Sequence, residues 1–145
     1  MNPLRDVIKG KRLVVVDDSI VRGNTSKKVV KMLYSAGARE IHMRISSPPL
    51  LYPCYYGIDM ATKKEFVANC RTLEDIRKYL NVDSLRYLSI EGLVKAIGEP
   101  KDKFCFACFN NDYPVPIPEN IQFDKYFMEG EEYQNEEGYF SRTKR

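Results

Sequence analysis

The stretch Leu13–Ser26, LVVVDDSIVRGNTS, places two adjacent carboxylates directly after a run of four apolar residues. The run Leu13–Val16 is mostly β-branched, which is typical of a strand buried on both faces of a parallel sheet. Asp17 and Asp18 follow it, and a short loop then leads to Thr25, where helical spacing begins. Ligands of open parallel sheets bind at the carboxyl ends of strands, so this stretch predicts a fold class and a binding site together.

A helix and a second strand are expected after the loop. Residues 25–36 show helical spacing, and Gly37 is placed to end the helix. The apolar side chains on the predicted face are Val29, Met32, Leu33 and Ala36. Residues 40–46, EIHMRIS, alternate in the manner of a strand, with Ile41, Met43 and Ile45 inward. Strand, loop, helix and strand form one βαβ unit, which predicts an α/β fold with a parallel sheet flanked by helices.

The middle of the chain predicts a long connection and further short elements. Residues 47–62 contain three prolines, which excludes a continuous helix, and residues 63–69 are a short helix candidate. Thr72 and Asp75 resemble a capping box, which would open a helix. The side chains expected on its buried face are Leu73, Ile76 and Leu80. Residues 83–89 predict a short strand, and Ser89 can cap a helix that ends at Gly98.

Composition bounds the class of protein. The chain has 145 residues, 43% hydrophobic and 30% charged, which suits one globular core. The net charge of +3 is mild, and Lys and Arg are scattered, so nucleic acid is not an expected partner. No apolar run approaches the ~20 residues of a membrane span, and no secretory leader is visible. We therefore expect no membrane partner and a cytoplasmic location.

The loop after the first strand suits a sugar phosphate. A helix N-terminus attracts anions through free N–H groups, a glycine allows close approach, and hydroxyls add donors. Carboxylates repel phosphate but accept hydrogen bonds from sugar hydroxyls or hold Mg²⁺. The simpler alternative is that paired acids merely start a polar turn. The predicted binding residues are Asp17, Asp18, Ser19, Ile20, Val21, Arg22, Gly23, Asn24 and Thr25, with Asp17 and Asp18 at the magnesium.

The four cysteines raise a separate question. Disulfides are unusual in a cytoplasmic chain, so ligation of a metal or cluster is weighed against plain buried thiols. Cys105 and Cys108 form a CxxC pair, which alone fits zinc, a redox pair or a cluster equally well. His42 is the single histidine, so a histidine-rich zinc site is excluded. His42 itself is expected to be a partly exposed strand residue.

Four motifs in order carry a family resemblance. They are NPLRDVIKGKRLVVVDDSIVRGNTS, SSPPLLYPCYYGIDM, YLSIEGLVKAIG and FCFACF. The first resembles the phosphoribosyl pyrophosphate (PRPP) motif of type I phosphoribosyltransferases. Together, over residues 2–113, they resemble the C-terminal part of glutamine PRPP amidotransferase, also called amidophosphoribosyltransferase. One departure is Asn24, where family members commonly carry Thr, although Asn also offers a donor.

The resemblance implies a fold, a domain arrangement and a reaction. It implies part of the type I phosphoribosyltransferase domain in residues 1–98. A cysteine-containing C-terminal wrap is expected in 99–127 and a disordered tail in 128–145. The family makes 5-phosphoribosylamine, glutamate and pyrophosphate from PRPP, glutamine and water, at the first committed step of purine synthesis. The residues that match Asp17 and Asp18 bind ribose and Mg²⁺ in the family, and those that match 19–25 bind the 5-phosphate.

The resemblance also assigns the cysteines. Some family members carry a [4Fe–4S] cluster, and Cys54, Cys105 and Cys108 match three of its ligands. The fourth ligand lies upstream in the family, and Cys70 is expected to be an ordinary buried thiol. The cluster would be structural and tie the C-terminal segment to the sheet. Zinc bound by CxxC, or a redox pair, stays as an alternative.

Partners follow from the same resemblance. The glutaminase domain and the first strands of the phosphoribosyltransferase sheet are absent, so the chain is expected to be an incomplete enzyme, inactive without those segments. The apolar run Leu13–Val16 would then expose an unpaired edge that is prone to association.

A homo-oligomer and inhibition by purine nucleotides are further expectations from the resemblance. Tyr52, Tyr55 and Tyr56 cluster around Cys54 in the sequence, and they could stack on a nucleotide or pack over the connection as amphipathic core residues. The alternative function is a non-catalytic regulator that senses PRPP.

Overall fold

The computed structural model describes residues 3–58 and 66–117. Its elements, in chain order, are α1 (Arg5–Ile8), β1 (Arg12–Asp17), α2 (Asn24–Ser35), β2 (Glu40–Ile45), α3 (Val67–Cys70), α4 (Leu73–Leu80), β3 (Ser84–Tyr87), α5 (Ile90–Ile97), η2 (Lys101–Lys103) and α6 (Ala107–Asn110). No helix among these residues has the length and apolar character needed to cross a membrane.

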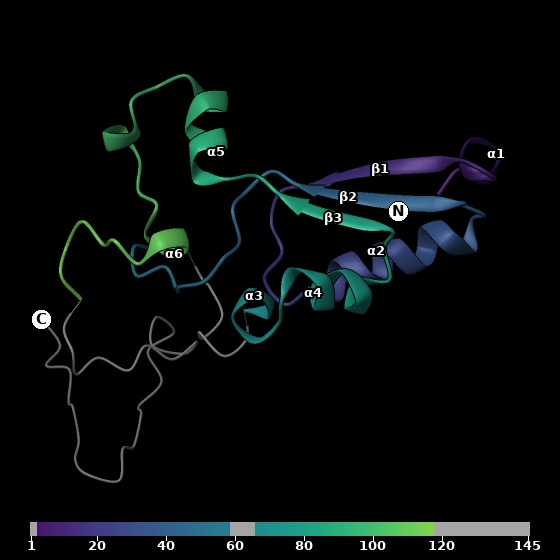
Figure 1. Ribbon diagram of the computed structural model, residues 1–145, viewed down its shortest axis with the longest axis horizontal. Helices are drawn as coiled ribbons and strands as arrows, with labels where there is room; N and C mark the ends of the chain where they lie inside the picture. Colours follow the sequence, from purple (N-terminus) through teal and green to yellow (C-terminus); the bar gives the residue numbers. More distant parts are fainter. Residues whose placement is uncertain (1–2, 59–65, 118–145) are drawn as a thin grey trace, which may run out of the picture.

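The three strands form one parallel sheet in the order β1-β2-β3. Val15 lies opposite Met43, which lies opposite Leu85 on the third strand. Helices α2, α3 and α4 lie on one face of the sheet, and α5 and α6 lie beyond the carboxyl ends of the strands (Figure 1). This arrangement confirms the predicted α/β class, with a parallel sheet flanked by helices, and it orients every strand end toward the same edge.

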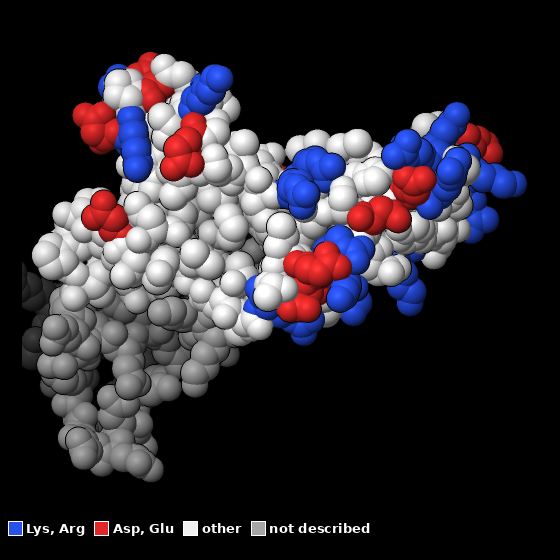
Figure 2. All heavy atoms as spheres, in the orientation of Figure 1, with Lys and Arg blue, Asp and Glu red and all other residues white. Residues whose placement is uncertain are grey.

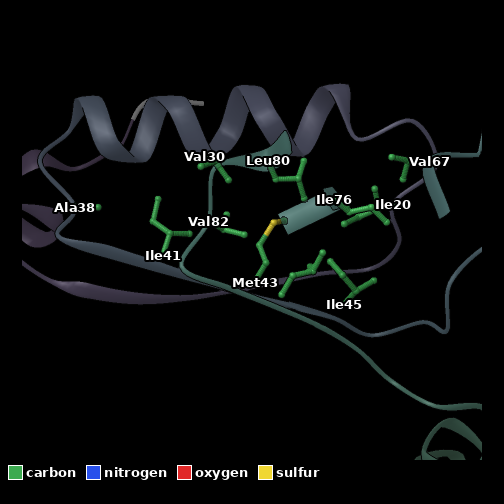
Figure 3. Packing of buried hydrophobic residues seen from close by; sticks show 11 residues of the cluster. Ile20, Val30, Ala38, Ile41, Met43, Ile45, Val67, Ile76, Leu80 and Val82 are labelled. Carbon is green, nitrogen blue, oxygen red and sulfur yellow. The ribbon is translucent and has the colours of Figure 1, made fainter. Parts of the chain in front are cut away.

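The hydrophobic core lies between the sheet and these helices. Ile41, Met43 and Ile45 point from β2 toward Val30 of α2 and Leu80 of α4, as Figure 3 shows. All five side chains are at most 3% exposed. The three from β2 form the inward face that the sequence predicted for this strand. Burying side chains of this size stabilises a fold by roughly 1.5–3 kcal/mol each, so this layer holds the strands and helices together.

The first strand is buried on one face only, which corrects the expectation of burial on both. Leu13 and Val15 pack against the core, whereas Val14 is 66% and Val16 is 69% exposed. The cause is that the described helices that pack on the sheet cover a single face (Figure 1). Within the described residues, β1 also has a strand on one side only, so the expected open edge is present.

Two predicted helix faces need adjustment. On α2 the most buried apolar side chain is Val30, at 1%, whereas Val29, Met32 and Leu33 are only partly buried. Helical spacing alone does not decide whether Val29 or its neighbour Val30 faces the sheet. On α4, Ile76 and Leu80 are buried as predicted, but Leu73 is 42% exposed because it is the first residue of the helix, away from the core.

Local capping signals in the sequence are confirmed. The Thr72 hydroxyl accepts a hydrogen bond from the Asp75 N–H, and the Asp75 carboxylate accepts the Thr72 N–H, which completes the capping box. Ser89 caps α5 by accepting the Gly92 N–H at 3.0 Å, and that helix ends at Gly98. The predicted strand in 83–89 is β3, and the candidate in 63–69 is α3 in its described part.

The segment after Glu99 has more structure than expected. Residues 99–117 include two short helical turns, η2 and α6, where only loop or extended chain was predicted. Short turns of four residues or fewer carry too little periodicity to be read from sequence. The remainder of the predicted wrap and the predicted tail, residues 118–145, lie outside the described residues.

Candidate functional site

The two acids at the end of β1 are placed differently. Asp17 Oδ1 accepts the Asp18 N–H at 3.1 Å, and its Oδ2 accepts the hydroxyl of buried Ser26 at 3.3 Å. Asp18 is exposed and accepts the Ser19 N–H at 2.7 Å. Asp17 is therefore fixed against the first turn of α2, while Asp18 faces solvent at the carboxyl end of the strand.

The loop between the acids and α2 is anchored to the protein interior. Ile20 is 2% exposed and belongs to the hydrophobic core. The carbonyl of Val21 accepts the N–H of Val67 at 2.8 Å, which ties the loop to α3. With the Ile20 side chain inside, that residue can meet a ligand only through its backbone. The predicted site residues thus run without a break from the last residue of β1, through the loop, to the first turn of α2.

Gly23 sits where the loop becomes helix. It is the N-cap of the 12-residue helix α2, with φ +77°, a left-handed conformation that favours glycine. A Cβ there would lie 3.2 Å from Tyr79 Cε1 and 3.4 Å from Leu80 Cδ2. Within the described residues no side-chain hydrogen bond caps this helix, and free N–H groups at a helix start favour an anion. Gly23 therefore stands at the start of α2, where the sequence predicted an anion-binding loop.

Tyr79 is the residue at this site that sequence reasoning missed. Its hydroxyl donates to Asn24 Oδ1 at 2.9 Å, across 55 positions of sequence. The Lys27 Nζ lies 4.2 Å and the Arg71 Cζ 4.4 Å from the centroid of its ring. These are cation–π distances, and they bring two positive charges beside the loop. No motif or spacing in the sequence indicates this cluster, because the packing of α4 on α2 creates it.

The three cysteines of the predicted cluster site lie in the same region of the structure, where residues 51–54 meet residues 105–108. Burial is the main cause that raises the pKa of the Cys108 thiol, and the nearby Cys54 and Cys105 raise it further. Leu51 and Tyr52 each donate a backbone N–H to the Cys108 carbonyl at 3.0 Å. Segments that are far apart in sequence therefore meet here.

Tyrosines surround this meeting point. The Tyr113 hydroxyl donates to the Pro53 carbonyl at 2.7 Å, and its ring centroid lies 5.1 Å from that of Tyr55. Tyr56 donates its hydroxyl to the Val115 carbonyl and accepts the Val115 N–H, both at 3.0 Å. These contacts show that Tyr55 and Tyr56 pack on the C-terminal segment, and they tie residues 53–56 to residues 113–115.

The structure also corrects and limits the metal predictions. Cys70 is exposed at the end of α3, so the expectation of a buried thiol is wrong. Its helix is four residues long and does not turn that side chain toward the core. Within residues 3–58 and 66–117, no group of three or more His, Cys, Asp or Glu side chains is arranged to hold a single metal ion. The donor set of Cys54, Cys105 and Cys108 fits part of a thiolate cluster, which takes four ligands.

His42 is a strand residue, as predicted. Its side chain is 21% exposed, and its ring nitrogens lie 2.9 Å from the Ser84 hydroxyl and 3.2 Å from Glu40 Oε2. Neither of these partners is a predicted site residue.

Charged side chains of both signs are interspersed over the sheet and its helices, whereas the face near α6 is mostly uncharged (Figure 2).

Known proteins resemble this chain in sequence and in fold. No family model matches it. Amidophosphoribosyltransferase of Synechococcus elongatus is 51% identical over 129 residues, which is 89% of this chain and 26% of that protein. The enzyme of the same name from Methanothermobacter thermautotrophicus is 54% identical over 121 residues, 83% of this chain and 26% of the relative.

A solved structure agrees with these relatives. Glutamine PRPP amidotransferase from B. subtilis, complexed with ADP and GMP, matches with a TM-score of 0.76 and 48% identity. The match covers 82% of this chain and 27% of that one. Fold and strand-end loop together define a phosphoribosyltransferase-type α/β protein. The chain belongs to the amidophosphoribosyltransferase family and corresponds to the C-terminal part of its members. It spans about a quarter of the length of the curated relatives it matches.

Proposed function

We propose that this chain is the PRPP-binding part of an amidophosphoribosyltransferase. The enzyme would convert PRPP, glutamine and water to 5-phosphoribosylamine, glutamate and pyrophosphate. The observation that carries the proposal is the strand–loop–helix unit from β1 to α2. It presents two carboxylates and an uncapped helix N-terminus at one strand end, in a chain more than 50% identical to enzymes of that name.

Each part of the unit has a chemical task. The 5-phosphate of PRPP would lie on the loop 19–25, where backbone N–H groups and the hydroxyls of Ser19 and Thr25 are donors. The ribose hydroxyls and Mg²⁺ would lie at Asp17 and Asp18. Mg²⁺, when bound, makes pyrophosphate a better leaving group, and the carboxylates favour positive charge that develops at the sugar. The chain has no assigned residue for activating ammonia or glutamine.

Activity would require the rest of the enzyme. The matched relatives are about four times longer, so glutamine hydrolysis and the remaining strands would come from segments outside this sequence. The open edge at β1 is a suitable place for those strands, because β1 lacks a neighbour there within the described residues. This supports an incomplete enzyme over a self-sufficient regulator that senses PRPP. A homo-oligomer and purine nucleotide inhibitors belong to the same proposal.

A [4Fe–4S] cluster at Cys54, Cys105 and Cys108 is the second part of the proposal. What supports it is that the segment of Cys54 meets the segment of the Cys105–Cys108 pair, because Leu51 and Tyr52 donate their backbone N–H groups to the Cys108 carbonyl at 3.0 Å. A fourth thiolate would come from elsewhere in the complete enzyme. When bound, the cluster would hold α6 against residues 51–56 and would take no part in the transfer.

Binding of Mg²⁺–PRPP to the complete enzyme that contains this chain tests the proposal. Asp18→Asn should weaken binding at least tenfold, as measured by isothermal titration calorimetry. Asp102→Asn is the matched control, because Asp102 is an exposed carboxylate on η2, and it should bind as the parent does. Equal affinity in all three proteins would contradict a PRPP site at this strand end.

A further inference from the structure

We propose that Tyr79 is a positioning residue that orients the Asn24 amide so that it donates to an anion at the start of α2. This inference rests on the proposed function, because it concerns the loop that would hold the phosphate. It adds a residue from α4, a part of the chain that has no place in the loop itself.

The contacts of Tyr79 reach the loop at two adjacent residues. The hydroxyl donates to Asn24 Oδ1 at 2.9 Å. The ring edge lies 3.2 Å from the point where a Cβ on Gly23 would stand. One side chain thus packs beneath the N-cap of α2 and hydrogen-bonds the first residue of the helix. A shift of Tyr79 would disturb both at once.

The chemistry of the amide explains why the hydrogen bond matters. An asparagine side chain has one acceptor oxygen and one NH₂ group at opposite ends of a planar amide. A donor on the oxygen therefore turns the NH₂ group away from Tyr79. Asn24 is exposed at the first position of α2, where the backbone N–H groups also favour negative charge. With its oxygen occupied, the side chain presents donors rather than an acceptor to an approaching phosphate.

Two cations hold the ring and add charge. Lys27 in the first turn of α2 and Arg71 before α4 lie within 4.2 and 4.4 Å of the ring centroid. They restrain the tyrosine from two different elements. They also offset part of the negative charge of Asp17 and Asp18, which would otherwise repel a phosphate. Tyr79, on α4, therefore contacts both the loop and the first turn of α2.

Titration of the full ¹⁵N-labelled chain with ribose 5-phosphate tests the inference, with ribose as the uncharged control. We expect the Gly23 backbone amide and the Asn24 side-chain NH₂ to shift with ribose 5-phosphate and not with ribose. Tyr79→Phe keeps the ring and removes the hydroxyl. This variant should weaken binding of ribose 5-phosphate about three- to tenfold and abolish the shift of the Asn24 NH₂. Its other resonances should keep the dispersion of the folded parent chain.

Two further variants separate positioning from stability. In the Asn24→Ala chain, Tyr79→Phe should change the affinity by less than about 1.5-fold, because the group it orients is gone. Tyr34→Phe removes a different hydroxyl hydrogen bond, at the far end of α2, and should lower stability without weakening binding. This control shows whether a general loss of stability is enough to affect the site.

The results separate a failure of the role of Tyr79 from a failure of the proposed function. If the parent chain shows no response to ribose 5-phosphate, both the phosphate loop and the role of Tyr79 are wrong. If the parent binds and Tyr79→Phe binds equally well with an unchanged Asn24 signal, the inference is overturned and the proposed function stands. Weaker binding of Tyr79→Phe that is independent of Asn24 also overturns it.

Discussion

Tyr34 donates a hydrogen bond from its hydroxyl to Asp83 Oδ2 at 2.8 Å, and the same carboxylate oxygen accepts the Ile41 N–H at 2.7 Å. The bond joins α2 to the residue before β3, across 49 positions of sequence. Burial, followed by the neighbouring carboxylate, raises the pKa of Tyr34 to about 12. The Ile41 hydrogen bond, followed by that of Tyr34, lowers the pKa of Asp83. This junction fastens the amino ends of two strands to the helix.

Removal of the Asp83 carboxylate should destabilise the chain measurably. Asp83→Ala leaves the N–H of fully buried Ile41 without its acceptor, which costs about 1–2 kcal/mol of unfolding free energy. Tyr34→Phe removes only the hydroxyl and should cost about 1 kcal/mol or less. Urea unfolding followed by circular dichroism checks both values. Equal stability of Asp83→Ala and the parent would show that the junction does not support the fold.

The same two groups predict opposite pH limits. The pKa of Asp83 is below its ordinary 3.8, so its stabilisation is present above that value and is lost as pH falls through the folded pKa. The pKa of Tyr34 is raised from 10.0 to about 12, so its stabilisation is present below 10.0 and is lost as pH rises toward 12. Unfolding free energies of Asp83→Asn should fall less steeply in acid, and those of Tyr34→Phe less steeply in alkali.

Gly23→Ala should damage the loop more than the backbone conformation alone explains. Gly98→Ala is the matched control, because Gly98 has the same φ of +77° but nothing within 4 Å of a new Cβ. Each change costs about 1 kcal/mol for a left-handed residue. At Gly23 the contacts with Tyr79 and Leu80 add to that cost, and Mg²⁺–PRPP binding by the complete enzyme should weaken as well. Equal losses in the two variants would show that the close packing is unimportant.

Serine substitution tests the cysteine cluster in the complete enzyme. Cys54→Ser, Cys105→Ser and Cys108→Ser should each lower the iron and acid-labile sulfide content at least fivefold, because a [4Fe–4S] cluster needs its thiolates. Cys70→Ser is the control, since Cys70 is exposed on α3 and is not among the thiols that perturb Cys108. Zinc in place of iron in the parent enzyme would favour the alternative reading of CxxC.

The exposed face of β1 predicts a contrast between neighbouring valines. Val16→Lys should change the unfolding free energy by about 0.5 kcal/mol or less, because Val16 is 69% exposed. It should also reduce self-association of the chain in sedimentation experiments, since a charge discourages edge pairing. Val15→Lys places a charge against the core and should cost roughly 2 kcal/mol or more. Similar costs at both positions would contradict the one-sided burial of this strand.

Elements with strong local signals were predictable from sequence. The alternation of Ile41, Met43 and Ile45 gave β2 its inward face, and Thr72 with Asp75 located the start of α4. The positions of the acids at the carboxyl end of β1 and of Gly23 before α2 were also predicted. These features depend on residues that are close in sequence, where spacing and capping chemistry apply directly.

What escaped prediction depends on packing between distant segments. Four apolar residues in a row look the same whether one or both faces of the sheet are covered, so the exposure of Val14 and Val16 could not be foreseen. Tyr79 reached the loop only because α4 packs beside α2, and the helical turns η2 and α6 are too short to leave a pattern. The burial of Ile20 was missed for the same reason.

The inward position of Ile20 has a consequence for how this protein can change. A residue in the middle of the proposed ligand loop is also a member of the hydrophobic core. Substitutions that repack the interior near Ile20 will alter the shape of the loop, and substitutions that reshape the loop will open space inside. Ligand affinity and thermal stability therefore both depend on Ile20. A substitution there that improves one of them is constrained by its effect on the other.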